Sequence, residues 1–160
     1  MKKLLLIAAI IAALAIPGSS WAVGSCTQTA TKDKDSSVVS ITFACTGDAA
    51  NGSIPDTDVS AANMALVLDK AALNSVVAYP TSGGTAPDAA DVQILMNSMD
   101  LLGGLGTNLI HATATQGLNP SSTFTGDTWF PIITGTLTLK VSNQATASAN
   151  YTVKLLFYRR

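Results

Sequence analysis

The sequence predicts a mainly β protein, an antiparallel β-sandwich of about seven to eight short strands with one short helix, behind a cleaved N-terminal signal helix. Short runs of alternating apolar and polar residues recur between clusters of Gly, Pro, Asn, Asp and Ser. The chain has ten acidic residues, all Asp, and charged residues make up only 12% of it, which disfavours long solvated helices. Jelly-roll connectivity is one arrangement open to such a sandwich.

The first 22 residues have the pattern of a secretory signal peptide. A basic start is followed by an unbroken apolar run at 4–16, then by Pro17 and Gly18, and Ser20-Trp21-Ala22 fits a signal peptidase site. The run is shorter than the roughly 20 apolar residues that span a bilayer. We therefore expect one mature β-sandwich domain, 23–160, exported to the periplasm or the extracellular space, with no membrane span after cleavage.

The charge of the mature chain excludes some partners. Seven basic and ten acidic residues remain after cleavage, a formal net charge of −3. This balance gives no basic patch for nucleic acid or an anionic membrane surface. We therefore expect no nucleic-acid partner.

The first predicted pair of strands is a hairpin held by a disulfide. Runs at 27–32 and 38–45 flank a polar turn, and an antiparallel hairpin places Cys26 opposite Cys45 and Gln28 opposite Phe43. An even cysteine count in an exported chain favours a bond, worth about 3 kcal/mol on the chain-entropy model. Lipidation of Cys26 is the alternative, but nine residues separate it from the apolar run.

The remaining elements follow from hydrophobic periodicity and turn residues. Asp58 or Ser60 is expected to cap a short helix. In chain order, the predictions are a helix at 61–66, a strand at 73–79, a loop at 80–90, a strand at 92–96, a turn at 100–108, a strand at 109–115, a surface loop at 116–127, and a terminal hairpin of 137–141 with 151–158.

Residues able to carry catalysis are few. His111 is the only histidine, it lies in a strand pattern, and no Gly-x-Ser-x-Gly motif accompanies it, so we expect a structural role. Gly103, Gly104 and Gly106 lack the Lys or helix of a phosphate loop, which predicts a tight turn with positive φ. We therefore expect no catalytic site and no cofactor.

Metal binding rests on two groups of aspartates. Asp56 with Asp58, and Asp88 with Asp91, offer oxygen ligands for calcium, but neither group has EF-hand spacing. Capping and turn chemistry explain Asp58 and Asp88. We expect no metal site and keep calcium at these loops as the alternative.

The candidate contact surface consists of aromatic residues and long loops. Tyr79, Trp129 and Phe130 are able to form an aromatic platform for a sugar or a partner, with burial in the core as the alternative. The loops at 80–90 and 116–128 add to this surface, because long loops on a rigid scaffold commonly carry recognition.

Two resemblances bear on function. The segments AYPTSGGTAPDAADVQI, DLLGGLGTNLI and PIITGTLTLKVSNQATASANYTVKLLF, over roughly 61–156, resemble in their order small β-sandwich structural proteins of tailed phages and prophages. This resemblance implies a virion or particle-surface role. NYTVKLLFY near the C-terminus resembles, more weakly, the terminal strand of chaperone–usher pilins, although only 23–25 precede Cys26. That resemblance implies a fimbrial-type subunit.

These observations predict an exported, non-enzymatic structural or surface-interaction protein. Its partners would be further copies of the chain or a component of a surface or particle, recognised through strand edges or an apolar patch. A secreted carbohydrate- or partner-binding module and a fimbrial-type subunit are the alternatives.

Overall fold

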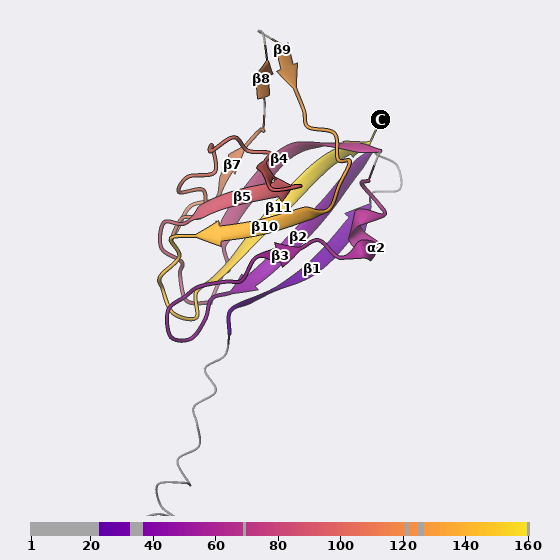
Figure 1. Ribbon diagram of the computed structural model, residues 1–160. Helices are drawn as coiled ribbons and strands as arrows, with labels where there is room; N and C mark the ends of the chain where they lie inside the picture. The colour runs from indigo at the N-terminus through magenta and orange to yellow at the C-terminus, as the bar shows by residue number, and fades with distance from the viewer. Residues whose placement is uncertain (1–22, 33–36, 69, 121, 125–126, 160) are drawn as a thin grey trace, which may run out of the picture.

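Two antiparallel sheets pack face to face as a β-sandwich (Figure 1), which confirms the predicted fold class. The computed structural model describes residues 23–32, 37–68, 70–120, 122–124 and 127–159, with only the backbone described at 122–124 and 127–129. The predicted signal peptide, 1–22, lies outside the described residues. No helix in the described part is long and apolar enough to cross a membrane.

The larger sheet has five strands in the order β1-β2-β11-β4-β7. Its strands are Ser25–Lys32 (β1), Val38–Thr46 (β2), Asn150–Arg159 (β11), Ala71–Pro80 (β4) and Gln116–Leu118 (β7).

The smaller sheet has four strands in the order β3-β10-β5-β6. They are Thr57–Asp58 (β3), Leu137–Ser142 (β10), Asp91–Met96 (β5) and Met99–Asp100 (β6). A separate two-stranded ribbon, Ser122–Phe124 (β8) with Asp127–Trp129 (β9), projects beyond one end of the sandwich (Figure 1).

The core forms because each long strand buries every second side chain between the sheets. Val153, Leu155 and Phe157 of β11 are fully buried, and the predicted alternation at 92–96 and 137–141 also points inward as expected. The other buried core positions on the long strands are Val39, Ile41, Phe43, Cys45, Ala71, Leu73, Val76, Ala78, Val92, Ile94, Met96, Leu137, Leu139 and Tyr151.

The β1–β2 hairpin has the predicted register. Cys26 pairs with Cys45, Gln28 with Phe43 and Ala30 with Ile41. The Cys26–Cys45 disulfide is formed across this pair. It indicates folding in an oxidising compartment.

The predicted short helix is one turn long, Ala61–Met64 (α2). Ser60 is its N-cap, and the Ser60 side chain accepts a hydrogen bond from the Asn63 backbone N–H at 3.4 Å. Asp58, the other predicted cap, instead accepts a hydrogen bond from the Thr138 hydroxyl at 2.6 Å. Met64 is the buried residue of the turn and attaches it to the core.

The predicted terminal hairpin is wrong in its pairing, although both strands exist. β10 pairs with β3 and β5, whereas β11 pairs with β2 and β4 in the other sheet. The connection at 143–149 therefore crosses from one sheet to the other. Each of these strands buries one face. Its alternation of apolar and polar residues is therefore the same whether the two strands pair side by side or lie in opposite sheets across the core.

The predictions for 109–115 and 116–127 are also wrong. Ile110 forms only an isolated bridge with Ala90. The chain then turns, because Nδ1 of His111 accepts hydrogen bonds from the backbone N–H groups of Thr113 at 3.2 Å and Ala114 at 3.1 Å. The expected surface loop contains β7, which pairs with β4, and the β8–β9 ribbon.

Tyr151 carries a buried polar atom without a partner. Its side chain is fully buried, and its hydroxyl is the only buried side-chain N or O in the described residues that forms no hydrogen bond. Burial, and secondarily the negative charge of Asp88, raise the pKa of the Tyr151 phenol above its ordinary value.

We expect Tyr151→Phe to leave stability at neutral pH unchanged or to raise it by about 1 kcal/mol, because it removes an unpaired buried hydroxyl. The raised pKa means that the wild-type protein loses stability above about pH 10, where the unfolded phenol ionises first. Below that pH the phenol is neutral in both states. Urea unfolding of both proteins from about pH 8 to about pH 11 measures this loss, which the variant should lack. An identical alkaline loss in both proteins would contradict the assignment.

Candidate functional site

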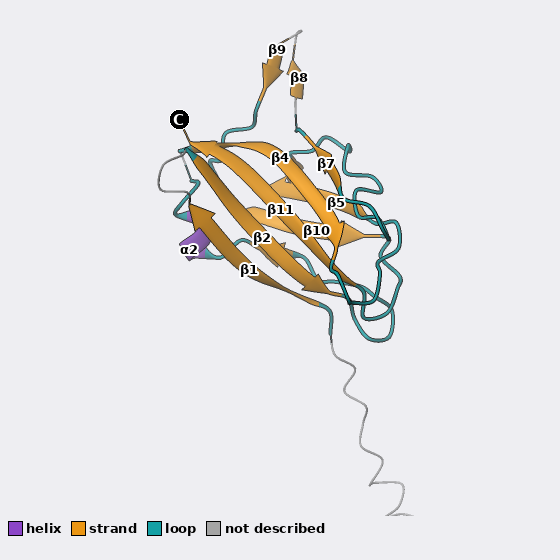
Figure 2. Ribbon diagram, turned by 180° about the vertical axis from the view of Figure 1, so that it is seen from behind, coloured by secondary structure: helices purple, strands orange, loops and turns teal. Residues whose placement is uncertain are grey.

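The outer face of the five-stranded sheet is the broadest regular surface of the described chain. Its inner face packs on the smaller sheet, and no other described element lies over its outer face (Figure 2). Side chains on adjacent strands lie about 4.8 Å apart, and those on one strand about 6.7 Å apart. The outward side chains form a regular array, set by the registers of β1, β2, β11 and β4.

Threonine is the most frequent residue of this array. Thr29 of β1 pairs with Thr42 of β2, which in turn pairs with Lys154 of β11. Lys154 is the only charged side chain among the described outward positions of the four long strands, and no Asp accompanies it. The threonines of the outer face are Thr27, Thr29, Thr31, Thr42, Thr46 and Thr152.

Short side chains make the β1–β2 part of this surface accessible to a partner, whereas Tyr158 of β11, 49% exposed, projects from the same face. Thr27, Thr29 and Ala44 are exposed, and Thr42 and Lys154 are half-buried. Such a face offers hydroxyls for hydrogen bonding and little charge to desolvate, which suits close approach of a second surface. We define this outer face of β1, β2, β11 and β4 as the threonine face.

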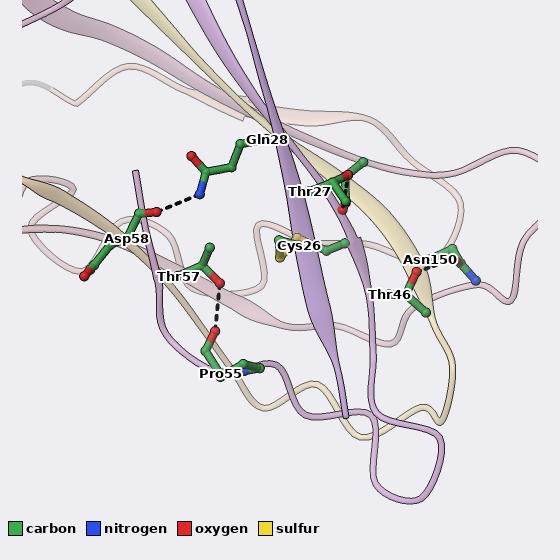
Figure 3. Close-up of a disulfide and its surroundings, with 10 residues drawn as sticks. Cys26, Thr27, Gln28, Thr46, Pro55, Thr57, Asp58 and Asn150 are labelled. Atoms are coloured by element: carbon green, nitrogen blue, oxygen red, sulfur yellow. Dashed lines mark hydrogen bonds between the residues drawn. A yellow bond between two sulfur atoms is a disulfide. The ribbon is translucent and has the colours of Figure 1, made fainter. Parts of the chain in front are cut away.

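The β1 edge of the threonine face is fixed by contacts to the other sheet. The side-chain amide of Gln28 donates to the backbone carbonyl of Asp58 at 2.6 Å (Figure 3), and its oxygen accepts from the backbone N–H of Ser60 at 2.9 Å. With the Cys26–Cys45 disulfide beside it, Gln28 ties the edge strand to β2 and to the β3–α2 segment. The edge is therefore rigid in its described part.

The predicted aromatic residues do not form one cluster. Tyr79 is half-buried on the threonine face, opposite Thr152 of β11. Phe130 is half-buried and precedes Pro131, whose carbonyl accepts from the N–H of Leu73 near the other end of β4. The side chain of Trp129 lies outside the described residues. Tyr79 and Phe130 stay predictions as contact residues, but at separate places.

The other residues singled out by sequence have structural partners. Besides its bonds to the Thr113 and Ala114 backbone, Nδ1 of His111 lies 3.5 Å from the Thr113 hydroxyl. No Ser or Asp is a hydrogen-bond partner of His111 in the described part. The ring therefore holds a turn together.

The aspartates weighed as alternative calcium ligands form separate contacts. Asp91 accepts from the backbone of Asn108 at 2.8 Å and from the side chain of Asn143 at 2.6 Å. Asp88 accepts from the backbone of Ala145 at 3.0 Å. Within the described residues, no three His, Cys, Asp or Glu side chains lie together as a metal site.

The glycine turn follows the prediction at two of its three positions. Gly103 and Gly104 have φ of +57° and +82°. Gly106 is required for a different reason, because a Cβ there would collide with the carbonyl oxygen of Val92. The turn is closed by Asp100, whose carboxylate accepts from the backbone N–H groups of Leu102 and Gly104, both at 3.0 Å.

The threonine face was missed by sequence reasoning. The alternate threonines of β1 and their partners on β2 follow from the predicted hairpin register. The rest of the face depends on β11 lying beside β2, which reverses the pairing that the sequence favours.

These features describe a disulfide-bonded antiparallel β-sandwich with one open face. Comparison with protein-family models, with curated proteins and with solved structures finds no match for this chain.

Proposed function

We propose that this chain is an exported, non-enzymatic structural or surface-interaction protein of the periplasm or extracellular space. It acts as a subunit that associates with copies of itself or with a component of a particle or surface. The observation that carries the proposal is the threonine face, an extended array that no described element covers and in which Lys154 is the only charge.

Physical chemistry supports association through this face. An extended sheet face offers little enclosure to a small molecule, whereas it offers a second protein surface a broad area of contact. Low charge keeps the desolvation cost of such a contact small. The resemblance to phage and prophage structural proteins favours the same role.

Fractionation of the native culture tests the proposal. Medium and envelope are separated on a density gradient, and the chain is located by mass spectrometry. We expect it in a particle, filament or envelope-associated fraction. Recovery only as a free monomer in the soluble fraction would overturn the proposal.

A pair of variants links this result to the threonine face. Thr42→Lys places a second positive charge opposite Lys154 in the middle of the face, and Gln93→Lys places the same charge opposite Lys140 on the outer side of β5 in the other sheet. Both positions are half-buried on inner strands, so the effects on folding are comparable. We expect only Thr42→Lys to move the chain into the soluble fraction. If both variants were recovered in the same fraction, association through the threonine face would be contradicted.

A binding module is the second candidate, favoured by a hollow beside α2. The hollow has a volume of about 570 Å³ and is lined by Val59, Ala61, Met64, Leu68 and Thr136 among others. Its size falls within the range of small-molecule sites, although it is open. A soluble monomer in the fractionation would direct ligand screening to this hollow. The fimbrial-type alternative predicts filaments in the same experiment.

A further inference from the structure

We propose that β1 pairs with β1 of a second copy of this chain. The two strands run antiparallel and join two five-stranded sheets into one continuous ten-stranded sheet. This inference deepens the proposed function and rests on its self-association branch.

The β1 edge is long and unprotected. β1 is the outermost strand of the larger sheet and has eight residues. The other outermost strands of the two described sheets are short, with three residues in β7 and two each in β3 and β6. Natural sheets protect their edges with short strands, Pro, bulges or inward charges. β1 has no Pro, its pairing with β2 has no register shift, and its only charge is at its last residue, Lys32.

Part of the β1 backbone points its hydrogen-bonding groups away from β2. The Cα atoms of Cys26 and Cys45 are 4.0 Å apart, which marks this pair as the close, non-hydrogen-bonded kind. Pairs alternate along an antiparallel ladder, so Cys26, Gln28 and Ala30 direct their N–H and C=O groups away from β2. β2 is the only strand that pairs with β1 in the described part of the chain. The outward groups of these three residues therefore form a ready ladder.

β1 is complementary to a second copy of itself in antiparallel orientation. In a parallel pair the two Lys32 side chains would lie about 5 Å apart and repel each other. In an antiparallel pair centred on Gln28 or Thr29 they lie more than about 20 Å apart. Thr27 and Thr29 then face threonines of the other copy, which is a favourable cross-strand pair. The sequence of β1 is thus complementary to itself.

The geometry also limits the assembly. The two-fold relation uses the β1 edge of each copy completely, and the remaining described edges are too short to continue the sheet. Pairing of one strand buries less than the roughly 1,000 Å² of a stable interface. We therefore expect a dimer that dissociates on dilution, with a micromolar or weaker Kd.

The test is analytical ultracentrifugation of the oxidised mature protein over a wide concentration range. Ala30→Pro removes one outward N–H and leaves the β1–β2 ladder intact, because edge strands accept Pro where the N–H faces solvent. Ala30→Ser keeps the N–H and is the matched control. We expect a dimer for the wild type and for Ala30→Ser, and a Kd raised about tenfold or more for Ala30→Pro. Thermal unfolding confirms that each variant is folded.

A second pair of variants keeps the test decisive if Ala30→Pro fails to fold. Thr29 is exposed, so Thr29→Lys and Thr29→Asp are compatible with the fold. Each alone should weaken the dimer through like charges near the two-fold axis, and an equimolar mixture should restore it as a heterodimer.

Two outcomes would overturn the β1 pairing. One is a wild-type monomer at all concentrations, and the other is a dimer that neither set of variants changes. If the native chain is still recovered in a particle fraction, the proposed function stands without this interface. Recovery of the native chain only as a free monomer would instead contradict the proposed function as an associating subunit.

Discussion

Phe157→Ala is expected to destabilise the protein by about 3–5 kcal/mol. Phe157 is fully buried on β11, the central strand of the larger sheet, where it pairs with Val39 of β2 and Leu73 of β4. Truncation removes the transfer free energy of the ring and leaves a cavity that three close-packed strands cannot fill by relaxing. Urea or thermal unfolding of the oxidised protein measures the loss.

The adjacent residue is the matched control. Tyr158 lies on the opposite face of the same strand and is 49% exposed, so Tyr158→Ala should cost about 0.5 kcal/mol or less. The two truncations remove aromatic rings of similar size one residue apart. Their contrast therefore measures which face of β11 packs on the core. Similar losses for both would contradict the sandwich geometry.

The hairpin of β1 and β2 was predictable in detail because two independent signals agree. Alternation at 38–45 sets which side chains point inward, and the cysteines fix the register to the residue. The alternation of β11 was predictable for the same reason, with Val153, Leu155 and Phe157 all buried.

The partner of β11 was not predictable. Alternation tells which face of a strand is buried, but β10 and β11 would bury the same faces whether they paired with each other or packed across the core. The connection at 143–149 decides between them, and Asn143 and Ser148 both adopt positive φ there. Either residue also suits a simple hairpin turn, so the sequence does not distinguish the two.

The threonine face was hidden for the same reason. It combines strands from the two ends of the chain, β1 and β2 with β11, and no single segment carries it. Threonine at alternate positions is ordinary in any half-exposed strand. The array becomes a feature only when Thr29, Thr42 and Lys154 are known to share a row.

Removal of the disulfide is expected to cost about 3 kcal/mol, the chain-entropy value for a loop of this length, which closes over a sequence separation of 19 residues. The variant is Cys26→Ala with Cys45→Ala, because Cys45 is buried and a serine hydroxyl there would add a desolvation cost. Reduction of the wild type should produce the same loss of unfolding free energy, and the double variant should not respond to reductant. A wild type whose stability is unchanged on reduction would contradict this prediction.

The position of the disulfide makes its loss local as well as global. β1 has a strand partner on one side only, and in the described part its other ties to the fold include the Gln28 contacts to Asp58 and Ser60. Hydrogen exchange in the double variant should therefore accelerate more at β1 amides than at β11 amides, which are bonded on both sides. Because an edge must be ordered before it can pair, the same variant should also weaken the β1–β1 dimer. Loss of this one bond would then lower both the stability of the fold and the affinity of the dimer, because the disulfide anchors the edge strand β1 to β2.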